Sequence, residues 1–497
     1  MSAALPVLLA VPAAGAGLLA LAPVSDRIAR VVGVATTSAA LLVSVVLAAR
    51  FDYGNGARLQ HVVDASWLPA LDVRFHLGVD GISLPLVLLT TLLTLLCAIH
   101  TVGSTPEPGR PRQLLALMLL LEVGVLGTFL AADLIVFFVF FEIVLIPMYF
   151  LINIWGGPGR RVAAVKFILY TLLGSALMLV GFLVIYSQAG TFDMVRLGHE
   201  HGGHISAGVQ LLAFVLLMLG FGIKSPMWPL HTWLPDAHTE APTVGSVLLA
   251  GVLLKMGTYG LIRIAVDEVP DGARRAAPAL AILAVIGIGY AALACLGQRD
   301  LKRLIAFSSV GHMGFVLLGI ATLTPIGLQA ALIGNVAHGV ITGLLFFLAG
   351  AVKERFHTSD LDELGGGLLA KLPMTGGVVL FAAIASLGLP GLAGFWGEML
   401  AMLGAYSPGG GSSRPLFLTL MALAGVGTVL TAVYFLAMLR RVDFGLVADR
   451  WRETAVHDVA VADVVAWTPL VVLAVAIGVW PRIVLAVGES AVSGLLR

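Results

Sequence analysis

Two lysines in strongly apolar sequence are the residues best placed to do chemistry. Lys224 ends an apolar run from Gln210 to Ile223, and Lys255 lies inside the next apolar segment, among Leu and Gly residues. No carboxylate stands within a helical turn of Lys255 to neutralise it. A charge at the centre of a bilayer costs at least about 2.5 kcal/mol, so such groups usually face a polar interior and transfer ions or protons. The two lysines therefore indicate ion or proton transport.

Four more ionisable residues lie deep in apolar sequence. Glu142 lies in FFVFFEIVLIPMYF, and two histidines follow in SSVGHMGFV and GNVAHGVITG, before a glutamate in FWGEMLAML. Histidine titrates near neutral pH and can relay protons, although a single buried histidine is often only a hydrogen-bonded core residue. A hydrogen-bonded structural acid is likewise the alternative for Glu142. We expect a buried row of proton-transferring groups, made of Glu142, Lys224, Lys255, His312, His338 and Glu398.

Three further residues are weaker candidates for the same chemistry. Glu122, in LMLLLEVGVLG, is either a second acid on this route or a helix-packing partner. His231 and His238 lie with Asp236 and Glu240 in the polar connection that follows the first lysine. Solvated loop residues are ordinary in such a connection, and a role in proton handling is the alternative.

The sequence predicts no cofactor or metal site in this chain. Cys97 and Cys295 are isolated within apolar segments, so neither an iron–sulfur cluster nor a zinc site can be built from them. The run HEHGGH at 199–204 resembles a metal-binding tract, but it lies in a loop with no scaffold to fix its ligands. Any redox centre is therefore expected on a partner protein.

The composition is that of an integral membrane protein. Of 497 residues, 59% are hydrophobic and 11% are charged, and the mean hydropathy is +1.01. Apolar runs long enough to cross a hydrocarbon core of about 30 Å recur from end to end. In lipid the backbone must satisfy its own hydrogen bonds, so these runs are expected to be helices. A net charge of +1 argues against nucleic acid as a partner.

The apolar runs predict about fourteen membrane spans. Their expected ranges are 4–22, 29–49, 78–101, 112–131, 133–155, 164–188, 207–224, 242–265, 276–297, 302–322, 326–350, 373–406, 415–440 and 463–481. Lys and Arg are more numerous in the odd-numbered connections, such as those holding Arg160 and Arg440. Cytoplasmic connections carry that excess, so we expect both termini on the opposite, external side.

Two predicted spans are interrupted. The seventh breaks at 224–235, within KSPMWPLHTWLP, and the twelfth breaks at GLPGLAG, residues 388–394. Spans four to eight and nine to thirteen each hold five helices with the break in the fourth, and an odd repeat length forces the two copies to lie inverted, as in transporters. We therefore predict an all-α polytopic membrane protein with two inverted five-helix repeats. Its expected divisions are 1–106, 107–270, 271–441 and 442–497.

Four motifs carry a family resemblance. KSPMWPLHTWLPDAHTEAPTVGSVLLAGVLLKMGTYG, FEIVLIPMYFLI, DLKRLIAFSSVGHMGF and GLPGLAGFWGEML resemble the antiporter-like membrane subunits of respiratory complex I. The resemblance covers nearly the whole chain. Within the family the chain is most similar to the subunit M, or chain 4, type, because other members usually carry Lys at the position of Glu398. The sequence also ends soon after the last span, without the long lateral helix of subunit L.

This resemblance implies a role for each candidate residue. Glu142 and Lys224 would form a coupling pair, Lys255 would carry the proton, and two histidines would bridge it to Glu398. NADH, FMN, iron–sulfur clusters and quinone are expected on partner subunits. The implied partners are the other membrane-arm subunits, including adjacent antiporter-like subunits, and the lipid of a bacterial inner (cytoplasmic) membrane.

Two other functions compete with this one. A subunit of a monovalent-cation/proton antiporter would carry the same broken helices and lysines, but Glu398 weighs against it. A structural membrane scaffold would explain the apolar spans but not several ionisable groups at depth.

Overall fold

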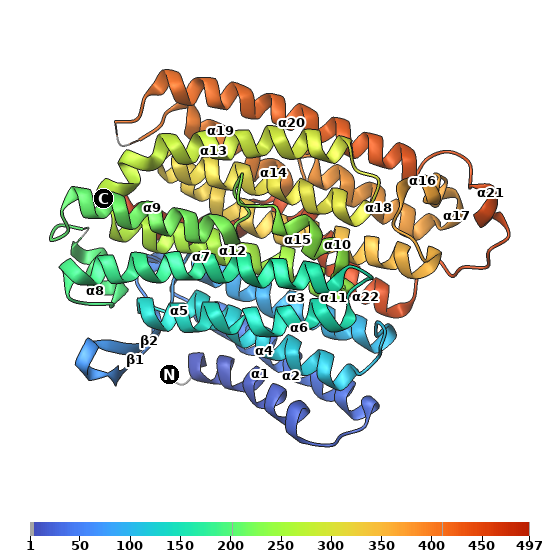
Figure 1. The fold of residues 1–497 in the computed structure, drawn as a ribbon, viewed down its shortest axis with the longest axis horizontal. Helices are drawn as coiled ribbons and strands as arrows, with labels where there is room; N and C mark the ends of the chain where they lie inside the picture. The colour runs from blue at the N-terminus through green and yellow to red at the C-terminus, as the bar shows by residue number, and fades with distance from the viewer. Residues whose placement is uncertain (1–3, 201, 410, 497) are drawn as a thin grey trace.

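The computed structural model of the chain is an elongated bundle of helices that run side by side along its long axis (Figure 1). It describes residues 4–200, 202–409 and 411–496. Within these, thirteen helices are long and apolar enough to cross a membrane. They are α1 (Ala4–Leu21), α2 (Asp26–Ala49), α3 (Ser83–Gly103), α4 (Pro111–Leu130), α5 (Leu134–Ile143) continued by α6 (Leu145–Trp155), α7 (Arg160–Ala189), α9 (Ala207–Lys224), α11 (Thr243–Leu248) continued by α12 (Leu254–Gly260), α13 (Pro270–Leu296), α14 (Leu301–Ala321), α15 (Pro325–Phe356), α20 (Arg414–Val442) and α22 (Val461–Val479).

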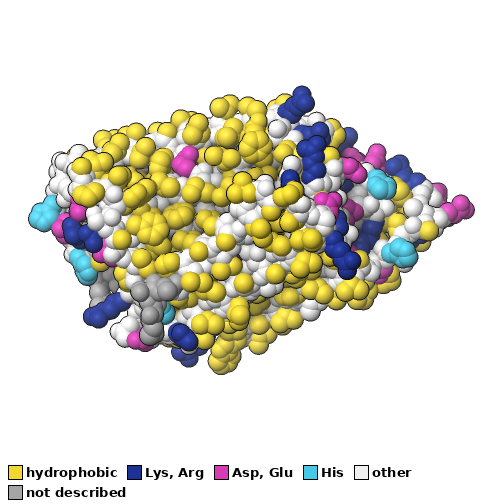
Figure 2. All heavy atoms as spheres, turned by 90° about the horizontal axis from the view of Figure 1, so that it is seen from below, with side chains coloured by type: hydrophobic (Ala, Val, Ile, Leu, Met, Phe, Trp, Pro, Cys, Tyr) yellow, Lys and Arg dark blue, Asp and Glu magenta, His cyan; other side chains and the backbone are white. Residues whose placement is uncertain are grey.

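The face of the bundle seen in Figure 2 is mostly apolar along its length, and most of its charged side chains gather at the two ends. Leu172 on α7, Leu293 on α13 and Val429 on α20 are each more than half exposed. A continuous apolar surface of this extent marks contact with a membrane. The predicted polytopic membrane protein is therefore confirmed.

The first predicted helix break is confirmed. α9 ends at Lys224, and the chain turns before α10 (Trp233–Glu240) begins. Pro226 and Pro229 lie in the turn. Proline has no backbone N–H to continue a helix, so α9 cannot extend through this sequence. The break leaves a buried lysine at the end of a helix.

The second predicted break is confirmed as well. It separates α18 (Pro373–Ser386) from α19 (Ala393–Tyr406), two half-helices that together make up the twelfth expected span, 373–406. Gly388 and Gly391 lie in the break with φ angles of 81° and 92°. Only glycine adopts such left-handed angles without steric cost, which is why the chain turns at these positions.

The connection after α2 forms a β-hairpin, which the all-helical prediction missed. β1 (Gln60–Leu68) pairs antiparallel with β2 (Val73–Val79), with Asp64 opposite His76 in the register. Charged and polar residues interrupt the apolar sequence here, so hydropathy predicts only a loop. The strand pairing instead satisfies the backbone hydrogen bonds of the connection.

Short helices cover the two ends of the bundle. The hairpin end, as we call it, carries the β-hairpin, α8 (Met194–Glu200) and α23 (Arg482–Leu495), and both chain termini lie toward it (Figure 1). The opposite end carries α16 (Leu361–Leu364), α17 (Leu368–Lys371) and α21 (Asp449–Arg452). Neither α8 nor α23 is long enough to span a membrane, so an analysis based on span length does not find them.

Two matching aspartate pairs mark equivalent points of the two repeats. Asp133 caps the N-terminus of α5 and forms an isolated antiparallel bridge with Asp193. Asp300 caps α14 and bridges Asp360 in the same way, with the same separation along the chain. The first pair lies beside β2 and the second beside α16, at opposite ends of the bundle (Figure 1). This is the arrangement that inverted repeats produce. The division of the chain into 1–106, 107–270, 271–441 and 442–497 stays a prediction.

Candidate proton-transfer site

Lys255 and His338 are in direct contact at the centre of the bundle. Lys255 lies in α12 between two π-helical segments, η3 (Leu249–Leu253) and η4 (Leu261–Val266), and its ammonium group donates to the Ala250 carbonyl. π-helical turns often occur at functional sites. The Lys255 Nζ is 2.5 Å from Nδ1 of His338, and both side chains are buried. Because an ammonium group only donates, His338 accepts through Nδ1, and the pair is placed for direct proton transfer.

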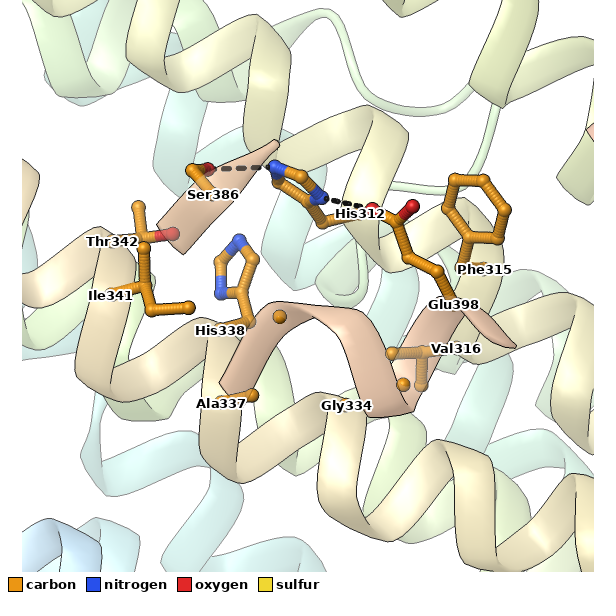
Figure 3. A pocket seen from close by; sticks show the side chains of 12 residues that line it. His312, Phe315, Val316, Gly334, Ala337, His338, Ile341, Thr342, Ser386 and Glu398 are labelled. Atoms are coloured by element: carbon orange, nitrogen blue, oxygen red, sulfur yellow. Dashed lines mark hydrogen bonds and ion pairs between the residues drawn. The ribbon is translucent and has the colours of Figure 1, made fainter. Parts of the chain in front are cut away.

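His312 links this pair to Glu398 (Figure 3). Its ring centre is 6.0 Å from that of His338, and its Nδ1 is 3.3 Å from Oε1 of Glu398. The other ring nitrogen, Nε2, is 3.0 Å from the Ser386 hydroxyl at the end of α18. His312 therefore joins α14 to both halves of the broken helix. The predicted neighbours Lys255, His338, His312 and Glu398 are brought together by four different helices.

A cavity of about 30 Å³ separates the two histidines from one another (Figure 3). Its lining includes both imidazoles, Ser386, Thr342 and Glu398. Nε2 of His338 and Oγ1 of Thr342 are buried without a hydrogen-bond partner among the described residues. A polar cavity of this size is large enough for a water molecule, and a bound water needs two to four polar partners. The cavity can thus complete a hydrogen-bonded path between the histidines.

Glu398 lies in the first turns of α19, directly after the second break. Oε2 accepts a hydrogen bond of 3.0 Å from the Thr428 hydroxyl on α20, and only 5% of the residue is exposed. Three hydroxyl residues of the site, Thr342, Ser386 and Thr428, were not predicted. Serine and threonine are common in membrane helices, where they bond to their own backbone, so their types and spacing give no signal.

Glu142 and Lys224 are not in contact. Lys224 is buried, and its ammonium group lies 4.9 Å from the centre of the Phe141 ring and 6.0 Å from that of Phe167. Glu142 instead lies near Ser175, one helical turn before Pro147, with one carboxyl oxygen buried and unpaired among the described residues. A cation over an aromatic face gains electrostatic stabilisation. The implied coupling pair therefore makes no contact within the 4.0 Å limit of an ion pair in this structure.

The weaker candidates are all buried or partly buried. Both carboxyl oxygens of Glu122 on α4 lack a hydrogen-bond partner within the described ranges. His238 is fully buried in α10 and stacks on Phe346 with ring centres 4.3 Å apart. His231 is 2% exposed and packs against Tyr290. The interpretation of these histidines as solvated loop residues is wrong, because the polar connection folds back into the bundle.

The rest of this connection is fixed by ion pairs and hydrogen bonds. Asp236 contacts Lys166 at 2.7 Å and Arg303 at 3.0 Å, and Glu240 accepts the Gly159 N–H. Lys302, the first residue of the tenth expected span, is a buried residue that the sequence did not single out. It is 2% exposed and donates to the Ala241 carbonyl at 2.5 Å. Its position two residues after the capping Asp300 was the available signal that it lies inside a helix.

No cluster of three or more His, Cys, Asp or Glu side chains suited to a metal occurs within the described ranges. His201, in the HEHGGH run, lies outside those ranges. Cys97 on α3 and Cys295 on α13 are buried as free thiols.

Sequence comparison relates this arrangement to known membrane proteins. Residues 131–431 match the family model described as NADH:quinone oxidoreductase/Mrp antiporter, TM. The chain belongs to this family. NADH-quinone oxidoreductase subunit M of Rhodobacter capsulatus is 40% identical over 491 residues, which are 95% of this chain and 92% of that protein. NAD(P)H-quinone oxidoreductase chain 4 1 of a Picosynechococcus species is 42% identical over 91% of this chain and 83% of that protein.

Solved structures agree with the membership of the NADH:quinone oxidoreductase/Mrp antiporter family. A chain of respiratory complex I from Thermus thermophilus with bound NADH matches with a TM-score of 0.86 and 31% identity, covering 99% of this chain and all of that one. A chain of the Mrp complex from Dietzia sp. matches with a TM-score of 0.85 at 23% identity, covering 100% and 97%. At that identity the second match shows the shared fold alone. The predicted resemblance to complex I membrane subunits is confirmed.

Proposed function

We propose that this chain is the antiporter-like membrane subunit, of the subunit M or chain 4 type, of a proton-translocating NADH-quinone oxidoreductase. The observation that carries the proposal is the buried row from Lys255 through His338 and His312 to Glu398, in which the two imidazoles line one water-sized cavity. The names of the relatives that cover nearly the whole chain support the choice of enzyme. The chain itself would move protons and take no part in electron transfer.

The geometry supports a defined order of proton steps. The Lys255 ammonium gives a proton to Nδ1 of His338, 2.5 Å away, and the imidazolium then releases its Nε2 proton into the cavity. Water there passes a proton to His312, which delivers it to the carboxylate of Glu398. The relay resets when Glu398 releases its proton onward, Lys255 is protonated again, and the proton on His338 returns from Nδ1 to Nε2 through exchange with water. Lysine suits the carrier position because burial can bring its pKa toward neutral pH, whereas arginine stays protonated.

Glu142 and Lys224 would control this transfer through the electric field. Charge arriving near Glu142 changes its attraction for Lys224, and a shift of the Lys224 charge changes the proton affinity of Lys255. Lys224 already lies free of an ion pair, over an aromatic ring, so its position depends on weak forces. Glu122, His231 and His238 extend the same polar interior as secondary candidates.

Partner subunits would hold everything that reacts with electrons. NADH, FMN, iron–sulfur clusters and quinone on those subunits would supply the redox free energy, and the adjacent membrane-arm and antiporter-like subunits would pass it on. We place the chain in a bacterial inner membrane with both termini on the external side, because the Lys and Arg excess lies in the odd-numbered connections.

The second candidate is a subunit of a monovalent-cation/proton antiporter, favoured by the fold shared with the Mrp complex. Purification of the chain from its native membrane separates the two. Co-purification with redox subunits and NADH-driven proton pumping are expected. Sodium-for-proton exchange by the isolated chain in vesicles would favour the antiporter and contradict the proposal.

A further inference from the structure

A second polar region lies away from the buried row, at the hairpin end. It surrounds a cavity of about 600 Å³ between the β-hairpin, α8 and α23. Charged and titratable side chains lie among the apolar residues of its lining. Those lining the cavity are Arg58, His76, Asp80, His199, Arg263 and Asp267.

One membrane-spanning helix connects this cavity to the buried row. Lys255, Tyr259, Arg263 and Asp267 occur at every fourth position from α12 through η4. Residues four apart lie on about the same side of a helix, and the contacts of Arg263 with Tyr259 and Asp267 continue through the π-helical segment η4. Lys255 is at the centre of the bundle and Asp267 is at the cavity. This side of the helix leads from the carrier lysine to the cavity at the hairpin end.

The contacts along this face are continuous from Tyr259 onward. The Tyr259 hydroxyl donates to the Phe129 carbonyl at 3.1 Å and lies beside the Arg263 guanidinium. Arg263 in turn contacts Asp267 at 3.2 Å and Asp80 at 3.7 Å. Asp80 is 1% exposed and is fixed by the backbone N–H groups of Ile82 and Ser83. Arg263 thus holds two carboxylates at the inner wall of the cavity.

A buried carboxyl group beside this cluster has no evident structural partner. Glu268 is 1% exposed, and neither of its oxygens has a hydrogen-bond partner among the described residues. Burial, together with the neighbouring Asp267, raises its pKa well above the usual range for a glutamate. Nearby, His76 and Asp193 form a buried pair at 2.8 Å. Burying so many ionisable groups is costly, which favours a functional explanation over a packing one.

We propose that the face carrying Tyr259 and Arg263 is the route by which Lys255 exchanges protons with water at the hairpin end, through the 600 Å³ cavity. This inference rests on the proposed function of Lys255. The Tyr259 hydroxyl, one helical turn from the lysine, turns from the Phe129 carbonyl to water, takes a proton on its oxygen and releases its own toward the Asp80 and Asp267 carboxylates, so the phenol is regenerated. Arg263 is a positioning residue that keeps the Asp80 and Asp267 carboxylates in place as acceptors.

A bulky group attached reversibly to a cysteine in the cavity, here called the plug, tests the route in the assembled complex. Val62 lines the cavity on β1 and is 40% exposed, and the native cysteines are buried. Val62→Cys is treated in vesicles with a bulky, charged, membrane-impermeant reagent that forms a disulfide. We expect labelling from the hairpin-end compartment only, near-complete loss of NADH-driven proton pumping, and recovery after a thiol reductant. Recovery shows that the plug and not misfolding caused the loss.

Leu71→Cys on the same hairpin, outside the cavity lining, is the matched control and should pump normally after labelling. Normal pumping by fully labelled Val62→Cys, or no labelling from either side, would overturn the proposal. Lys255→Ala in the same complex distinguishes a failure of the cavity route from a failure of the proposed function. If Lys255→Ala abolishes pumping while the plug has no effect, the cavity route fails and the proposed function survives. If Lys255→Ala pumps normally, the proposed function fails first.

Tyr259→Phe tests the link itself. It removes one hydroxyl and keeps the ring packed against Phe129 and Phe137. A positioned proton relay contributes at least about a hundred-fold to the rate of transfer, so a comparable fall in pumping is expected. Tyr149→Phe on α6 is the control and should retain the normal rate. Equal pumping rates in the two variants would remove Tyr259 from the route.

Discussion

The Lys255 and His338 side chains place two nitrogen atoms 2.5 Å apart in a site from which bulk water is excluded. Neither group has a carboxylate in contact, so a proton placed between them is stabilised mainly by the Ala250 carbonyl and by the two nitrogens themselves. Electrostatic interactions are strong in such a medium. Small changes in nearby charge therefore have a large effect on which nitrogen holds the proton.

Replacement of Lys255 by arginine separates a carrier from a fixed charge. Arginine keeps the cation but has a pKa above about 12 and cannot release its proton during turnover. We expect Lys255→Arg to lose proton pumping nearly as completely as Lys255→Ala, and a histidine variant to keep part of it. Pumping is measured in vesicles with assembled complexes. Lys166→Arg, in the ion pair with Asp236, is the control for the substitution itself. Near-normal pumping by Lys255→Arg would make Lys255 a fixed counter-ion.

At the scale of elements, the two broken helices bring functional groups to the middle of the bundle. The first break leaves Lys224 at the end of α9, and the second places Ser386 and Glu398 on either side of a turn. Both lie at positions where Pro or Gly prevents a continuous helix. The positions of Pro and Gly in the sequence therefore determine where these helices end and where polar groups lie at their ends.

Substitution of Gly388 tests whether the turn between α18 and α19 must keep its left-handed backbone. Gly388→Ala would place a Cβ atom 3.4 Å from Oε2 of Glu398 at a φ of 81°, and a left-handed alanine costs about 1–2 kcal/mol. We expect a lower unfolding temperature of the purified protein and weaker pumping. Gly377→Ala in α18 meets no atom within 4 Å, and it should be neutral or stabilising by up to about 1 kcal/mol. Equal unfolding temperatures of the two variants would show that the turn tolerates a side chain.

The end of α20 provides a pH-dependent contact. Asp443 is buried, both of its carboxyl oxygens are unpaired among the described residues, and burial raises its pKa to about 7. Its backbone carbonyl accepts the Leu369 N–H in α17. An unfolded aspartate titrates near 3.9, so the folded state holds more protons between about pH 4 and pH 7. Stability should therefore fall as pH rises through that window, by at most about 1.4 kcal/mol per pH unit.

Hydrogen exchange of residues 366–372 measures this effect. In the native protein their protection should decrease from pH 5 to pH 7 after correction for the intrinsic exchange rate. Asp443→Asn should flatten the dependence, because the side chain no longer titrates. Asp449→Asn is the control, since the side chain of Asp449 is 89% exposed. An unchanged slope in Asp443→Asn would assign the pH dependence to another group.

At the scale of the whole molecule, coupling must act over a distance, because Glu142 and Lys224 do not touch. We expect Glu142→Gln to assemble normally and to lose most proton pumping, since it removes a charge with little change of shape. Assembly is checked by co-purification of the partner subunits, and pumping by acidification of vesicles. Glu354→Gln on α15, in a side chain that is 42% exposed, is the control. Full pumping by assembled Glu142→Gln would exclude its charge from the mechanism.

Sequence patterns predicted most of the architecture, because membrane spans, proline and glycine breaks and intramembrane charges all have strong local signals. That Lys255 and His338 belong to one buried row was a prediction from their order along the chain and their depth, whereas their direct contact depends on how the helices pack. The β-hairpin was missed because its strands, of nine and seven residues, are too short to give a membrane-span signal, and charged residues interrupt their apolar sequence. The separation of Glu142 from Lys224 depends on how helices pack, and the roles of Ser386 and Thr428 depend on which helix each hydroxyl faces. Neither property is encoded in local composition.

The buried row crosses the bundle from helix to helix and does not follow any helix axis. Lys255, His338 and His312 each lie near the middle of a membrane-spanning helix, and Glu398 follows a break at similar depth. A voltage of 100 mV does about 2.3 kcal/mol of work on a unit charge only when that charge crosses the full membrane. Proton transfer along the row therefore moves almost no charge across the membrane and does almost no work against the membrane voltage. The electrical work falls on the steps that join the row to the two aqueous sides, and the internal relay can run in either direction without opposing the voltage.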